Sequence, residues 1–148
     1  MDDATHRALA VATFNQSQEL LHMQRAAHED RALLTAAFTS RHHWLAIGGP
    51  EEFAIADWLV SRAAAATGHA ALALQFATSA LTAGDADDTT EFPAWLRASL
   101  HEGLARAHAA AGNHAQRDVH IAHARALLVL ESDAADAALI EAQIAELL

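Results

Sequence analysis

The sequence predicts an all-helical protein in which pairs of helices stack side by side. Alanine-rich segments dominate a chain that is 53% hydrophobic, and alanine is the strongest helix former. Residues that favour strands are sparse, and no run alternates apolar with polar side chains. The segments 60–71 and 104–115 are near copies, in which Gly68 and Gly112 each separate two alanine-rich stretches. Self-similarity at this distance indicates a helical repeat, and we expect one domain over 1–148.

An N-terminal hairpin is predicted over 1–47, with helices at about 4–23 and 28–47. Apolar residues of the first helix recur at helical spacing: Val11, Phe14 and Leu21. Glu29 and Asp30 suit the positive end of the second helix dipole. The Gly-Gly-Pro run that follows is the strongest helix breaker in the chain and ends this hairpin.

A first repeat hairpin is predicted over 50–83. Pro50 begins its first helix, because proline is tolerated at the first helical position, and Gly68 ends that helix. The second helix is expected over about 69–83. The first helix is apolar on most of its circumference, which predicts a central position between neighbouring helices. Its clearly outward residues are expected to be Ala54, Asp57 and Ser61.

A second repeat hairpin is predicted over 90–131. Thr89 or Thr90 is the expected cap of its first helix, with Pro93 in the first turn. Gly112 separates that helix from the next one, because glycine adopts the left-handed conformation that ends a helix.

A last helix is predicted over 132–148, capped by Ser132 or Asp133. Its apolar residues are Leu139, Ile140, Ile144, Leu147 and Leu148. We interpret it as a capping helix over the final repeat, and the alternative is that it meets its twin in a homodimer.

Composition excludes several classes of function. The net charge of −10 argues against nucleic-acid binding, which needs a basic footprint. No apolar run is long enough to span a membrane, and the N-terminus has no signal pattern, which predicts a cytoplasmic protein. Cysteine, tyrosine and lysine are absent, which removes thiolate and Schiff-base chemistry. No cofactor is expected.

The repeat resembles the tetratricopeptide family, in which bulky residues, a glycine at the turn and small residues on the next helix interlock. The matching residues are Trp58, Val60, Gly68, Ala73, Ala77, Ala80, Leu104, Gly112, Ile121 and Ala124. The chain departs from the family in its longer repeat distance and at Ala64, His108 and Arg117. The segments 36–44, 56–62 and 101–107 are similar to small bacterial helical-repeat proteins of no established activity. The resemblance implies stacked hairpins and provides no catalytic residues.

Aromatic and charged side chains fall on helix faces that the aliphatic core does not need. Trp58 and Arg62 lie one turn apart, so that the guanidinium can cover the indole. Glu102 and Arg106 have the favourable i, i+4 spacing. The candidate ligand-binding residues, in a groove lined by the first, third and fifth helices, are Trp44, Trp58, Arg62, Trp95, Glu102 and Arg106. The alternative is that the charged members form a buried ion-pair network that holds the hairpins in register.

Eleven histidines and one acidic loop offer weaker patterns for a metal site. Histidines at spacings that place imidazoles on one helix face are His101 with His108 and His120 with His123. Glu19 and His22 have the Glu-x-x-His form of di-iron bundle proteins, which carry it twice with two further glutamates, whereas this chain shows it once. The acidic loop lacks the glycine and final glutamate of an EF-hand: Asp85, Asp87, Asp88 and Glu91. We interpret these groups as surface histidines and a solvated loop, and predict no metal.

Together these observations predict a non-catalytic binding or interaction module. Its partner would be a protein or peptide, or else a small molecule, because helical-repeat stacks expose concave binding surfaces. The alternative is a metal-dependent or His/Glu-dependent enzyme on the same helical scaffold.

Overall fold

The computed structural model describes residues 1–85 and 92–148, and these residues form seven α-helices and no strand. The helices are α1 (Asp3–Leu21), α2 (Ala27–Ile47), α3 (Pro50–Ala66), α4 (Ala70–Asp85), α5 (Ala94–Ala110), α6 (His114–Leu128) and α7 (Ala134–Ala145). Within the described ranges, no helix has the length and apolarity needed to cross a membrane.

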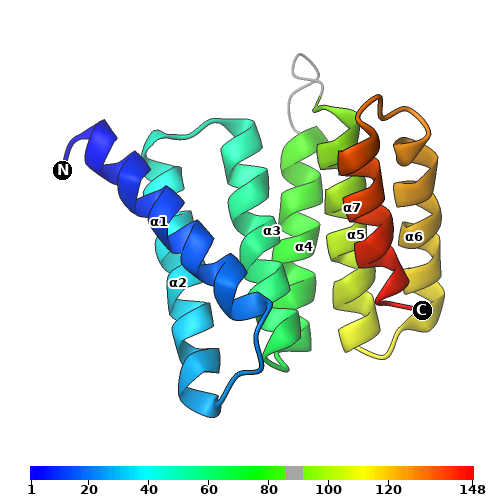
Figure 1. Cartoon of the computed structure of the whole chain (residues 1–148), viewed down its shortest axis with the longest axis horizontal. Helices are drawn as coiled ribbons and strands as arrows, with labels where there is room; N and C mark the ends of the chain where they lie inside the picture. Colours follow the sequence, from blue (N-terminus) through cyan, green and yellow to red (C-terminus); the bar gives the residue numbers. More distant parts are fainter. Residues whose placement is uncertain (86–91) are drawn as a thin grey trace.

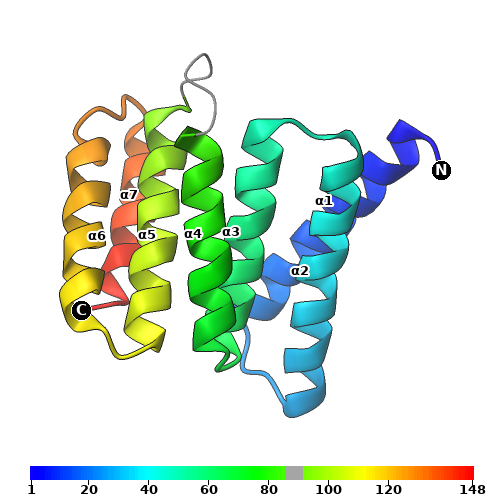
Figure 2. The same cartoon turned by 180° about the vertical axis from the view of Figure 1, so that it is seen from behind.

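Consecutive helices pack against each other as hairpins. The most extensive contacts join α1 to α2, α3 to α4 and α5 to α6 (Figure 1). Helix α3 also contacts α1, α2 and α5, which gives it the central position predicted from its apolar circumference. Helices α1 and α7 lie on the same side of the molecule, at opposite ends of the row formed by the other helices (Figures 1 and 2).

The two near-identical sequence segments form the same turn. Gly68 has a φ of +83° and Gly112 a φ of +75°, the left-handed conformation that glycine adopts without strain. The residue after each glycine closes the turn in the same way: the N–H of His69 donates to the carbonyl of Ala64, and that of Asn113 to the carbonyl of His108, both at 2.9 Å. The predicted breaks at both glycines are therefore confirmed.

The expected outward face of α3 is wrong. Ala54, Asp57 and Ser61 are only 0%, 6% and 1% exposed. Asp57 is buried because its carboxylate accepts from Arg41 of α2 and from Ser79 of α4, both at 2.6 Å. The hydroxyl of Ser61 donates to the carbonyl of Ala73 at 3.0 Å. Small size and polar partners on neighbouring helices thus allow this face of α3 to be buried.

Helix ends differ from the prediction by a few residues, chiefly at α5. Pro93 is the N-cap of α5 and does not lie in its first turn. The other expected caps, Thr89 and Thr90, lie outside the described residues, as do the loop residues Asp87, Asp88 and Glu91. Asp133 caps α7, as one of the two predicted residues, by accepting from the N–H groups of Ala135 and Asp136.

Candidate binding groove

An elongated apolar hollow of about 450 Å³ lies between α1 and α7, and we call it the central groove. Helices α3 and α5 form its floor, with Ile55, Trp58, Trp95, Leu96 and Ser99. Helix α1 forms one wall, with Phe14, Gln18 and His22, and α7 forms the other, with Asp136, Leu139, Ile140 and Gln143. A volume of this size with a few polar groups on an apolar lining is typical of ligand sites.

A smaller hollow of about 190 Å³ continues the central groove between α1 and α3, and we call it the side hollow. The two share Phe14 and Ile55, and the side hollow adds Val11, Trp44 and Glu52. The guanidinium of Arg7 lies 5.5 Å from the centre of the Trp44 ring. Trp44 therefore belongs to an extension of the groove and not to the same chamber as the other tryptophans.

A close approach of α3 and α5 sets the position of Trp58 in the groove floor. A Cβ atom on Gly103 of α5 would lie 2.8 Å from the Trp58 ring carbon Cδ1, too close for any other residue without rearrangement. The indole N–H of Trp58 is buried and has no hydrogen-bond partner among the described residues. Packing against Gly103 therefore holds this ring without help from a hydrogen bond.

The charged residues of the predicted site form a network centred on Glu102, which we call the Glu102 network. The Glu102 side chain is 0% exposed, and one carboxylate oxygen accepts from Arg62 at 3.0 Å. The other oxygen accepts from Arg106 at 2.6 Å, at the predicted i, i+4 spacing. The guanidinium of Arg62 also lies 5.2 Å from the centre of the Trp58 ring, as predicted.

The Glu102 network reaches α7 through Arg106. This guanidinium donates to the carbonyl of Gln143 at 3.0 Å and to the carboxylate of Glu146 at 3.1 Å. Burial lowers the pKa of Arg62, and the charge of Glu102 opposes that shift. The network thus joins α3, α5 and α7, and it fixes the helix that forms one wall of the groove.

The six predicted site residues therefore fall into three places. Trp58 and Trp95 line the central groove, and Trp44 lines the side hollow. The remaining three, Arg62, Glu102 and Arg106, bond mainly to one another beside the groove and are not among its lining residues.

The α7 wall was missed by sequence reasoning. Asp136, Leu139, Ile140 and Gln143 recur at the i, i+3, i+4, i+7 spacing of a single helix face. That periodicity was available in the sequence, but only the position of α7 against α5 shows which surface the face covers.

The predicted histidine pairs meet in one cluster between α5 and α6. The Nδ1 atoms of His101 and His120 lie 3.1 Å apart, and the rings of His108 and His123 stack on their neighbours. Burial lowers the pKa of His120, and the nearby His108 and His123 lower it further. Burial also lowers the pKa of His108. Over the described residues, no three or more metal-ligating side chains are arranged to hold an ion.

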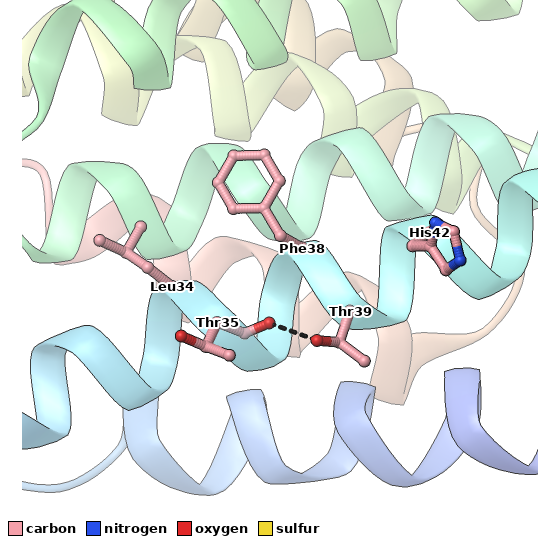
Figure 3. A pocket seen from close by; sticks show the side chains of 5 residues that line it. All are labelled: Leu34, Thr35, Phe38, Thr39 and His42. Carbon is pink, nitrogen blue, oxygen red and sulfur yellow. Dashed lines mark hydrogen bonds between the residues drawn. The ribbon is translucent and has the colours of Figure 1, made fainter.

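A shallower and more open hollow lies along α2, where successive turns contribute Leu34, Thr35, Phe38, Thr39 and His42 (Figure 3). The hydroxyl of Thr39 donates to the carbonyl of Thr35 at 2.8 Å and is therefore already engaged. A single helix provides all of these side chains, so polar groups do not converge on this hollow from several directions as they do on the central groove.

Comparisons of the chain with protein-family models, with curated proteins and with solved structures find no match.

Proposed function

We propose that the chain is a non-catalytic binding module that holds a ligand in the central groove, on a tetratricopeptide-like stack of hairpins capped by α7. The observation that carries the proposal is the groove itself, a hollow of about 450 Å³ in which side chains from four helices converge. Apolar and aromatic lining with a few polar groups suits a small ligand or the apolar side chains of a peptide or partner protein.

The six predicted residues take two roles in this proposal. Trp58 and Trp95 contact the ligand, and Trp44 extends the contact surface into the side hollow. The Glu102 network positions α7, because Arg106 joins the carboxylate of Glu102 to the backbone of Gln143. The alternative of a metal-dependent or His/Glu-dependent enzyme stays a prediction, and its metal-dependent form has no three-ligand site in the described part of the chain to support it.

The test uses the neutral dye phenylnaphthylamine, whose fluorescence rises in apolar surroundings. We expect the full chain to bind one equivalent, and Leu139→Ser to weaken binding about tenfold, because the side chain lost contacts the ligand directly. Leu139 is 59% exposed, so the substitution should leave the fold intact.

Leu130→Ser provides the matched control. This leucine is 69% exposed and does not line the central groove. Equal dye affinity in the two variants, or no dye binding by the unaltered chain, would contradict the proposed function.

A further inference from the structure

The lining of the central groove carries one carboxylate, one imidazole, which belongs to His22, and no arginine. The carboxylate belongs to Asp136, which is only partly exposed. Among the described residues, no group forms an ion pair or a hydrogen bond with the carboxylate of Asp136. The residue that caps α7 is Asp133 and not Asp136. The chain as a whole carries a net charge of −10. The groove is therefore complementary to a positive charge.

The aromatic lining of the central groove also favours a positively charged ligand. The chain already covers aromatic rings with guanidinium groups, with Arg7 over Trp44 and Arg62 over Trp58. In the described part of the structure, no cation lies over Phe14 or Trp95, the two other aromatic residues of the central groove. Aromatic faces attract ammonium groups, most strongly where water is excluded.

We infer that the central groove takes a small organic cation, with its apolar body on Trp58 and Trp95 and its ammonium group near Asp136. The inference rests on the proposed function and specifies its ligand class. Walls on two sides and a floor between them enclose about 450 Å³, a volume suited to a small molecule. The ammonium group gains the charge of the Asp136 carboxylate, whereas an anion would meet that carboxylate with the same charge.

The experiment measures displacement of phenylnaphthylamine by three competitors with the same phenylbutyl body: phenylbutylammonium, phenylbutanol and phenylpentanoate. We expect the ammonium compound to compete about tenfold more tightly than the alcohol, and the carboxylate to compete most weakly. Asp136→Asn should bring the ammonium compound to within about twofold of the alcohol without weakening the alcohol.

Glu141→Gln is the matched control, because it removes the same charge from α7 at a residue that pairs with Arg125 outside the groove. It should preserve the preference for the cation. Equal competition by ammonium and alcohol in the unaltered chain overturns the cation inference and leaves the proposed function standing. Failure of all three competitors to displace bound dye overturns the cation inference alone, and no dye binding by the unaltered chain overturns both.

Two further results would overturn the inference in part. A cation preference that survives Asp136→Asn would show that the carboxylate of Asp136 does not select the positive charge of the ligand. Displacement by a lysine-containing apolar peptide, with none by phenylbutylammonium, would replace the small molecule with a peptide as the occupant.

Discussion

At the scale of single residues, Glu102 is the least exposed charged residue in the described part of the chain, at 0%. A fully buried carboxylate is costly unless its oxygens are satisfied, and here each oxygen accepts from a different arginine. Two cations, Arg62 and Arg106, thus share one anion, with Glu146 as an exposed second partner for Arg106. The arrangement explains how a charged cluster is tolerated among alanine-rich helices.

Replacing that carboxylate should therefore be strongly destabilising. We expect Glu102→Gln to lower the free energy of unfolding by about 3 kcal/mol, because it leaves the buried guanidinium of Arg62 without an anion and Arg106 with only the exposed Glu146. Urea denaturation measures this change. Glu141→Gln, which removes one partner of an exposed ion pair, should change the urea midpoint little, and equal effects of the two variants would contradict the role given to Glu102.

The sequence predicted the contacts of some residues and not of others. The spacing of Glu102 and Arg106, and of Trp58 and Arg62, predicts contacts within one helix, and both are present. The burial of Asp57 and Ser61 was not predicted, because their partners Arg41, Ser79 and Ala73 lie on other helices. Helical periodicity identifies faces of a single helix and does not show which polar residue has a partner across an interface.

At the scale of secondary-structure elements, the two repeat turns follow directly from local sequence. A glycine with positive φ is followed by the same backbone hydrogen bond in both turns, so one local sequence pattern accounts for both. The start of α5 was predicted less well, because Pro93 precedes the helix as its cap and does not lie inside the first turn. The position of α7 depends on its contacts with α5 and α6, which local sequence patterns do not predict.

The turn glycines allow a test that separates strain from crowding. We expect Gly68→Ala to destabilise the protein by about 1–2 kcal/mol, since its φ of +83° is unfavourable for other residues and a Cβ atom would meet nothing within 4 Å. Thermal or urea unfolding measures the loss. Gly68→Asn is the control within the same site, and it should cost less because asparagine tolerates the left-handed region. Equal losses for alanine and asparagine would show that backbone strain is not the cause.

At the scale of the whole molecule, pairs of histidines connect the two helices within the α1–α2 hairpin and within the α5–α6 hairpin. His101 contacts His120 between α5 and α6, and His6 contacts His43 between α1 and α2 at 2.9 Å between their Nδ1 atoms. Burial lowers the pKa of His43, and its neighbours His6 and His42 lower it further. Each Nδ1–Nδ1 contact forms a hydrogen bond when one of the two nitrogens carries a proton. If both nitrogens are protonated, two N–H donors face each other and the hydrogen bond is lost.

Stability should consequently fall on mild acidification. His43, His108 and His120 have pKa values below the ordinary 6.5, so the unfolded chain takes up protons first as the pH drops. The free energy of unfolding should be constant above about pH 7.5 and decrease from pH 6.5 down to the lowered values. Urea denaturation between pH 7.5 and 5.5 measures this decrease.

Two variants show whether the clustered histidines cause that decrease. His120→Gln should reduce its size, whereas His28→Gln, at an exposed position, should leave it unchanged. Stability that does not respond to pH, or that responds equally in both variants, would contradict this account. The carboxylates with lowered pKa values, Asp2 and Asp118, act in a separate window, since the stability they confer is lost only around and below pH 3.8.

The carboxylate of Glu102 lies where α3, α5 and α7 meet, and this has a consequence for how the chain comes apart. Its partners belong to the middle of the sequence and, through Arg106, to its final turns. Fraying of the C-terminal helix removes two acceptors of Arg106, the carbonyl of Gln143 and the carboxylate of Glu146, so the loss of this end weakens the network in the middle of the molecule. The chain should lose its structure in one cooperative step.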